Sequence, residues 1–246
     1  MNILNTINSK QHSIAILIDP EKSDNGPLLA DLLKKAAFAE IDYLFIGGST
    51  VTRTEFSITV DFIKEHSSIP LIIFPGSANQ ISPNADGLLY LSLLSGRNPD
   101  YLIGHHIESA AELSQMDLEI IPTAYLLIDG GTQSSVAYVS QTSPIPRDKI
   151  SIVKNTAIAG KLQGKKIIYL DAGSGAKYSV PIEIITSIKE LELPIIIGGG
   201  IKTIEQIKNC HNAGATIVVI GNKLEEDSDF LMDVYNYKIS DVEKYN

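Results

Sequence analysis

Short runs of apolar residues recur along the chain, and most of them are followed by a segment with helical spacing. The runs are continuous rather than alternating, which is typical of parallel strands that are covered on both faces. Such strands, alternating with helices, predict an α/β fold, either a barrel or an open doubly wound sheet. The predicted strands are Ser13–Ile18, Tyr43–Ile46, Leu71–Phe74, Leu88–Leu94, Ile120–Leu127, Lys166–Leu170, Ile195–Ile197 and Thr216–Ile220.

Apolar spacing and capping residues predict the helices between these strands. Pro181 favours the first turn of a helix, and Thr203 with Gln206 forms a capping box that opens another. The segment after the third strand is too short for a full helix, so we expect that helix to be reduced or missing. Apolar residues at helical spacing predict further helices over Leu28–Ala37, Phe56–Ile63 and Ala110–Leu113.

Eight such runs alternating with helices favour the barrel over the open sheet, and the length of the chain agrees with it. The chain has 246 residues, close to the roughly 250 that are typical of a (β/α)₈ barrel. No internal repeat, low-complexity tract or linker divides it. We therefore expect a single (β/α)₈ TIM barrel domain over residues 1–246.

Charge and cysteine content narrow the setting. A net charge of −9 argues against broad nucleic-acid binding, although it permits a local positive pocket. Cys210 is the only cysteine, which excludes an intrachain disulfide and fits a reducing cytosol. The N-terminal residues lack the apolar core of a signal peptide, and no apolar run approaches the ~20 residues that span a bilayer. We expect a soluble, cytoplasmic protein.

Glycine is concentrated where the last two predicted strands end. Gly198-Gly199-Gly200 follows the seventh strand and Gly221-Asn222 follows the eighth. Glycine lets backbone N–H groups approach a ligand closely, and these two loops are the customary phosphate site of TIM barrels. The alternative is that the glycines only serve tight turns. The coincidence of two such loops favours the phosphate site.

Three further strand ends carry candidate chemistry. Asp171 opens a glycine-rich loop, and Tyr169, two residues earlier, is expected to point to the same side. A carboxylate at that place accepts hydrogen bonds from substrate hydroxyls or acts as a base, or else it caps a turn. Asp19 and Ser49 end the first two strands and offer oxygen ligands suited to Mg²⁺. A purely structural turn is the alternative at Asp19.

Taken together, these motifs resemble those of the geranylgeranylglyceryl phosphate synthase family, to which the bacterial heptaprenylglyceryl phosphate synthases also belong. The resemblance runs from the first strand to the last, in the family's order. It rests on Leu17-Ile18-Asp19-Pro20-Glu21-Lys22, Phe45-Ile46-Gly47-Gly48-Ser49, Phe74-Pro75-Gly76-Ser77, Tyr169-Leu170-Asp171-Ala172-Gly173-Ser174-Gly175-Ala176, Gly198-Gly199-Gly200-Ile201 and Val219-Ile220-Gly221-Asn222.

The resemblance implies a Mg²⁺-dependent prenyl transfer from a polyprenyl diphosphate to the 3-hydroxyl of sn-glycerol 1-phosphate. It implies Asp19 and Ser49 as Mg²⁺ ligands. Asp171, with Tyr169, is the predicted catalytic group that orients or deprotonates the hydroxyl. The family usually has Glu at that position. The implied glycerol phosphate ligands are Tyr169, Leu170, Asp171, Ala172, Gly173, Ser174, Gly175, Gly199, Gly200, Gly221 and Asn222.

The resemblance also bears on the donor and on assembly. One bacterial branch has Lys two residues before the metal-binding Asp, and Leu17 at that position indicates the archaeal-like branch and a geranylgeranyl donor. The resemblance implies a homo-oligomer. Because the prenyl substrate is apolar and the chain has no membrane anchor, it also implies transient membrane contact at most. Candidate groove-lining residues, which are otherwise core, are Tyr90, Leu94, Tyr101, Tyr125 and Leu127.

Two other functions remain open at this point. A phosphosugar isomerase or cyclase on the same barrel would use Asp19 and Asp129 as an acid–base pair and would need neither a prenyl groove nor much Mg²⁺. A noncatalytic barrel that senses a phosphate ligand would keep the glycines alone. The adjacent His105 and His106 are expected to lie in a helix with packing or surface roles.

Overall fold

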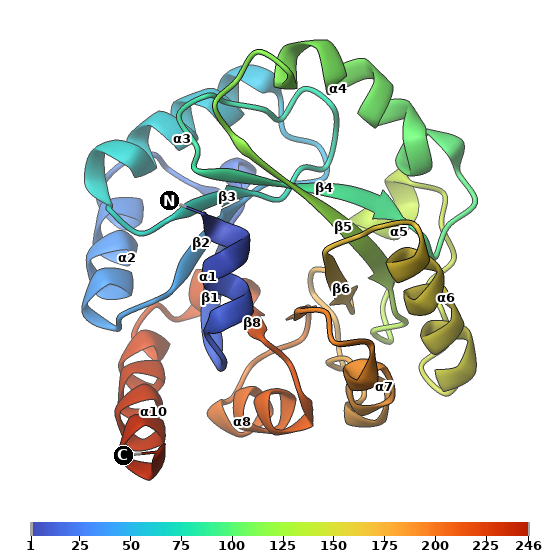
Figure 1. Cartoon of the computed structure of the whole chain (residues 1–246). Helices are drawn as coiled ribbons and strands as arrows, with labels where there is room; N and C mark the ends of the chain where they lie inside the picture. The colour runs from blue at the N-terminus through green and yellow to red at the C-terminus, as the bar shows by residue number, and fades with distance from the viewer. Residues whose placement is uncertain (1, 246) are drawn as a thin grey trace.

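The eight strands form one closed parallel barrel, in which each strand pairs with its neighbour in sequence and β8 returns to β1. The computed structural model describes residues 2–245, with side chains described through residue 240. Figure 1 shows the strands in the middle of a ring of helices. The strands are β1 Ser13–Ile18, β2 Tyr43–Ile46, β3 Leu71–Ile73, β4 Gly87–Leu93, β5 Glu119–Leu127, β6 Ile167–Asp171, β7 Ile195–Gly198 and β8 Ile217–Ile220.

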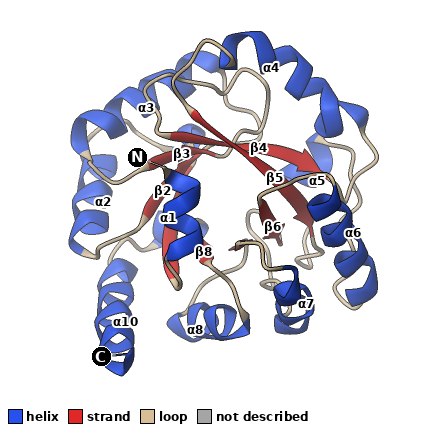
Figure 2. Cartoon of the chain, in the orientation of Figure 1, coloured by secondary structure: helices blue, strands red, loops and turns tan. Residues whose placement is uncertain are grey.

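Helices surround the barrel on its outer side (Figure 2). None of those within residues 2–245 combines the length and apolar character needed to cross a membrane. The longer helices are α2 Pro27–Phe38, α3 Arg53–His66, α4 His105–Leu113, α6 Ile150–Leu162, α8 Ile204–Ala213 and α10 Phe230–Tyr245. The shorter ones are α1 Ile3–Ser9, α5 Ser135–Val139, α7 Ile182–Ile188 and α9 Asn222–Glu226, with single turns at η1 Pro20–Lys22, η2 Asp100–Gly104 and η3 Lys189–Leu191.

Both faces of the strands are buried, which accounts for their continuous apolar sequences. Along β1, Ala15 lies in the barrel interior, whereas Ile14 and Ile16 pack outward in the layer between strands and helices. The same alternation places Phe45 and Tyr169 inside. Apolar residues are therefore needed at both parities, and the fold is the predicted (β/α)₈ barrel.

The expected gap in the helix ring is present, because residues 74–86 between β3 and β4 contain no helix. The capping box at Thr203 and Gln206 opens α8 as predicted. Pro181 stands just before α7, as its N-cap, rather than in its first turn. The helices α1, α5, α6, α9 and α10 were not predicted.

Helix α1 closes the amino-terminal end of the barrel, and in Figure 1 it lies across the middle of the ring. Its Ile3 and Ile7 are fully buried and belong to the cluster that fills the barrel interior. The backbone N–H groups of Ile3 and Leu4 donate to the carboxylate of Glu119, at the start of β5. This carboxylate therefore satisfies donors that a helix leaves unpaired at its first turn.

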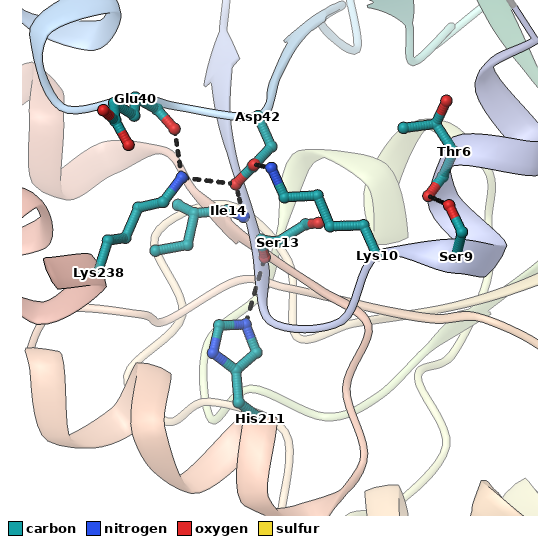
Figure 3. Close-up of polar contacts among 9 residues, drawn as sticks. All are labelled: Thr6, Ser9, Lys10, Ser13, Ile14, Glu40, Asp42, His211 and Lys238. Carbon is teal, nitrogen blue, oxygen red and sulfur yellow. Dashed lines mark hydrogen bonds and ion pairs between the residues drawn. The ribbon is translucent and has the colours of Figure 1, made fainter. Parts of the chain in front are cut away.

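An ion cluster centred on the buried Asp42 carboxylate links this end of the barrel to α10 and to the residue that follows α1 (Figure 3). The Asp42 side chain, 3% exposed, pairs with Lys10 after α1 and with Lys238 of α10. Asp42 also accepts a 2.8 Å hydrogen bond from the N–H of Ile14, and Lys238 donates to the carbonyl of Glu40. These contacts lie at the opposite end from the strand ends that carry the candidate chemistry.

Candidate active site

A pocket of about 390 Å³ lies at the carboxyl-terminal end of the barrel. Residues of the loops after β1, β2, β3, β6, β7 and β8 line it, and so do residues of β4 and α4. Function in TIM barrels sits at this face, because the strand-end loops converge there. The pocket joins a polar part among the loops to an apolar part under α4.

Asp171 lies at the floor of the polar part, as the last residue of β6. One carboxylate oxygen accepts a 2.6 Å hydrogen bond from the Tyr125 hydroxyl, and the other accepts a 2.7 Å bond from the N–H of Gly173. Burial raises the pKa of Asp171, and these two hydrogen bonds partly oppose the rise. Asp171 is thus an oriented carboxylate whose pKa is shifted toward the range useful for a base.

Three aromatic rings pack together beside this carboxylate, which one of them, Tyr125, contacts directly. Tyr169 stacks on Phe74 with ring centroids 4.9 Å apart, and Tyr125 meets both rings edge-on at 5.5 and 5.7 Å. As predicted, Tyr169 and Asp171 face the same pocket. Burial raises the pKa of both tyrosines well above their ordinary value, so their hydroxyls stay protonated. Their π faces offer a surface on which positive charge is stabilised.

The glycine loops after β6, β7 and β8 meet on the other side of the pocket. Gly199 and Gly200 have φ of +80° and +70°, and a Cβ on Gly200 would lie 2.8 Å from the backbone of Ser179. Only glycine fits there without strain. The side-chain oxygen of Asn222 accepts 2.9 and 3.2 Å bonds from the Gly175 N–H and the Ser174 hydroxyl. Asn222 therefore links the sixth loop to the eighth.

Asp19 and Ser49 face the pocket from the first two strand ends. Asp19 caps the single turn η1 by accepting from the N–H of Glu21, and its half-buried position raises the pKa of its carboxyl. A Cβ on Gly48 would lie 2.6 Å from Asp19 Oδ1, so this glycine brings the Ser49 loop against the carboxylate. Asp19 therefore both caps a turn and lines the pocket.

The apolar part of the pocket is lined by residues of β4 and α4 and by Ile81 of the helix-free segment 74–86. Tyr90 and His106 stack with ring centroids 4.0 Å apart, and the Tyr90 hydroxyl donates to the carbonyl of His106. His106 Nε2 lies 2.7 Å from the carbonyl oxygen of Leu91. The histidines of α4 thus have the expected packing role, at the wall of the pocket. Further lining residues are Ile81, Leu88, Tyr101, His105, Ser109 and Leu113.

Not every predicted site residue lines the pocket. The side chains of Leu170 and Ala172 lie in the outer layer between strands and helices, and Gly173 acts through its bond to Asp171. Tyr90, Tyr101 and Tyr125 line the pocket as groove candidates, but Leu94 packs against the outer core and Leu127 in the barrel interior. Ser174, Gly175, Gly199, Gly200, Gly221 and Asn222 all line it.

Comparison with known proteins agrees with this architecture. Residues 5–238 match the PcrB family. Geranylgeranylglyceryl phosphate synthase of Zunongwangia profunda is 48% identical over 86% of this chain and 90% of its own length. The synthase of the same name from Korarchaeum cryptofilum is 38% identical over 92% of each.

The chain belongs to the PcrB family.

Solved structures support this membership. (S)-3-O-geranylgeranylglyceryl phosphate synthase from Thermoplasma acidophilum, in complex with its substrate sn-glycerol-1-phosphate, has a TM-score of 0.89 and 32% identity over 96% of each chain. The tryptophan synthase α-subunit of Pyrococcus furiosus, at 14% identity and a TM-score of 0.55, shares the barrel fold with this PcrB protein.

Sequence reasoning missed two features of this PcrB site. The contact between Tyr125 and Asp171 depends on the register of β5 against β6, in which Tyr125 lies beside Tyr169 and Leu127 beside Asp171. Phe74 was assigned to the third strand but has its role in the aromatic cluster. The inward parity of Tyr125, two residues before Leu127, was the available signal.

Proposed function

We propose that this protein joins geranylgeranyl diphosphate to the 3-hydroxyl of sn-glycerol 1-phosphate, forming a prenyl ether and releasing diphosphate. The observation that carries the proposal is the continuity of the pocket. Glycine loops suited to a phosphate and an apolar groove suited to a prenyl chain line one pocket, and Asp171 lines it too. The names of the relatives support the same reaction.

In the proposed reaction, glycerol phosphate binds among the loops after β6, β7 and β8. Backbone N–H groups near Gly199, Gly200 and Gly221 bind the phosphate. Asp171 orients the 3-hydroxyl and takes its proton as the new carbon–oxygen bond forms. Tyr125 and the Gly173 N–H hold the carboxylate in place meanwhile. Fixed positions for both reactants supply much of the rate acceleration.

The departing diphosphate leaves positive charge on the allylic carbon. The rings of Phe74, Tyr125 and Tyr169 are placed to stabilise this charge through their π faces. The prenyl tail would extend under α4, past Tyr90 and Tyr101. An apolar tail in an apolar groove is held by the hydrophobic effect.

Asp19 and Ser49 fit Mg²⁺ as proposed ligands. Among residues 2–240, whose side chains are described, no group of three or more His, Cys, Asp or Glu side chains is arranged to hold a metal. Mg²⁺ needs only one or two carboxylates, with phosphate oxygens completing its coordination. Burial raises the pKa of Asp19 and so disfavours its ionised form, which a cation bound nearby would stabilise. Bound there, Mg²⁺ would stabilise the negative charge of the diphosphate as a Lewis acid.

Neither alternative function accounts for the whole arrangement of the site. Asp129 accepts a bond from the N–H of Gly131 and lines a separate, shallow depression with Thr132 and Gln133. It does not share the pocket with Asp19, so the acid–base pair of the isomerase hypothesis is not assembled. A sensor of phosphate ligands would have no use for the groove beside Asp171.

The test is an assay with purified protein, labelled sn-glycerol 1-phosphate, Mg²⁺ and prenyl diphosphates from C10 to C35. We expect label in the organic extract, most with the C20 donor, and none after the metal is removed with EDTA. If glycerol phosphate binds but no donor yields an extractable product, the transferase assignment is wrong.

A further inference from the structure

The pocket is unexpectedly acidic for a site that receives two phosphorylated substrates. Its lining includes the carboxylates of Asp19, Glu21, Asp171, Glu225 and Glu226, against the lysines Lys22, Lys202 and Lys223. Lys223 is directed to Asp227, with a 2.9 Å ion pair, and lies over the ring of Phe230. Lys22, by contrast, forms its ion pair with another residue of the pocket lining, Glu225.

Lys22 joins the first loop to the eighth. Its Nζ lies 2.9 Å from each carboxylate oxygen of Glu225, which belongs to α9 just after Gly221-Asn222. The side chains of Lys22 and Glu225 are 43% and 35% exposed. Ion pairs this exposed contribute little to stability. Fold stability is therefore a poor explanation for this pair.

The Glu225 carboxylate occupies a position where donors converge. Its Oε2 accepts from Lys22 Nζ at 2.9 Å and from the Asn222 side-chain amide at 3.2 Å. The other end of that amide is fixed by the Gly175 N–H, which leaves its NH₂ group directed at the carboxylate. A lysine and an amide directed at one oxyanion form the kind of site that a phosphate oxygen also fits.

We propose that Lys22 binds a phosphate oxygen of a bound substrate and that Glu225 holds this position as an internal counter-ion until the substrate displaces it. The inference rests on the proposed function, since it assigns a role within the same site. The convergence on Asn222 favours the phosphate of glycerol phosphate. The diphosphate of the donor carries the same chemistry, so the experiment examines both.

The two partners of the pair give opposite expected effects, which a structural ion pair would not. Lys22→Met removes a charged donor, and we expect the affinity for the phosphate ligand to fall about tenfold or more. Glu225→Gln removes the competing anion, so we expect the affinity to rise by a few fold. Lys22→Arg keeps the positive charge and is expected to retain most of the wild-type affinity.

Calorimetric titration of the full chain with sn-glycerol 1-phosphate, and separately with inorganic pyrophosphate and Mg²⁺, measures these affinities. A loss with Lys22→Met for either ligand supports the proposal and names the phosphate that Lys22 binds. Lys154→Met is the matched control, because Lys154 pairs with Glu190 on the outer helices at 2.6 Å, and it should change neither affinity.

The inference is overturned if Lys22→Met, shown to be folded by circular dichroism, binds both ligands as the wild type does. It is also overturned if Glu225→Gln weakens binding as Lys22→Met does. The binding measurements do not depend on turnover. A wild-type protein that binds both ligands but makes no ether product would refute the proposed function and leave the role of Lys22 to be judged separately.

Discussion

At the scale of single residues, the proposed reaction depends on how the Asp171 carboxylate is held. A buried carboxylate is a stronger base than an exposed one, because burial disfavours its charged form. The hydrogen bonds from Tyr125 and the Gly173 N–H lower the pKa of Asp171 and keep its carboxylate oriented. The position of the carboxylate is thus fixed by two hydrogen bonds, as the proposed role of Asp171 requires.

Asp171→Asn keeps the size of the side chain and removes its ability to take a proton. We expect kcat to fall by about 10²- to 10⁴-fold, the usual contribution of a general base, with a smaller change in KM for glycerol phosphate. Steady-state kinetics of prenyl transfer measure both constants. An unchanged kcat would show that Asp171 does not act as the base.

Tyr125→Phe tests the same carboxylate through its pH dependence. The Tyr125 hydrogen bond lowers the pKa of Asp171, so removing it should raise that pKa further. A base works only in its ionised form, which is lost as the pH falls through its pKa. The acidic limb of the profile of kcat/KM against pH should therefore move to higher pH in the variant. A shift to lower pH, or none, would contradict the arrangement.

At the scale of elements, glycines of different loops serve different purposes: one allows a backbone conformation, and another leaves space for a ligand. Gly200 has φ of +70° and its added Cβ would press on the Ser179 backbone. Gly221 has φ of −120°, and its Cβ would find the Leu17 side chain no nearer than 3.9 Å. The first glycine is needed by the fold, and the second keeps the pocket open.

Gly200→Ala and Gly221→Ala form a matched pair. We expect Gly200→Ala to lose about 1–3 kcal/mol of unfolding free energy through backbone strain. Gly221→Ala should unfold like the wild type but bind sn-glycerol 1-phosphate more weakly, since its methyl group enters the pocket. Urea unfolding and calorimetric titration distinguish the two effects. Equal stability losses would disprove the distinction.

The strands could be predicted closely from the sequence, because burial on both faces demands unbroken apolar runs. The helix α6 could not, since it buries mainly small residues, Val153, Ala157 and Gly160, and leaves Ile152 exposed. That pattern gives little contrast between its faces. The seven residues of α1 bury only Ile3 and Ile7 fully, which is too short a pattern to recognise.

The residues of the candidate site could also be predicted only in part. Strand ends marked by Asp19, Asp171 and the glycines follow from local sequence, because parallel strands bring their carboxyl ends to one face. Contacts between loops depend on register and on side-chain length. Tyr125 with Asp171, and Lys22 with Glu225, lie 46 and 203 residues apart, so neither contact could be predicted from local patterns.

At the scale of the whole molecule, the contacts that stabilise the barrel and the candidate active site lie at opposite ends. Helix α1 and the Asp42 cluster secure the amino-terminal end (Figure 3). The pocket occupies the carboxyl-terminal end. Substitutions at the two ends should therefore affect different measurements.

Asp42→Asn should destabilise the protein without altering its kinetics. The change leaves the buried ammonium group of Lys238, 15% exposed, without its counter-ion. Breaking a buried ion pair costs about 3 kcal/mol, and we expect a loss of that size in urea unfolding. KM and kcat measured at 20 °C, where the variant stays folded, should equal those of the wild type. Altered kinetics would show that the two ends are coupled.

The most direct test of the account is the stoichiometry of the reaction, followed by ³¹P NMR. Wild-type protein is mixed with sn-glycerol 1-phosphate, geranylgeranyl diphosphate and Mg²⁺. The account predicts that signals of diphosphate and of the prenylglyceryl phosphate rise together in equal amounts. Conversion of glycerol phosphate without release of diphosphate, or unchanged spectra with both substrates bound, would contradict it.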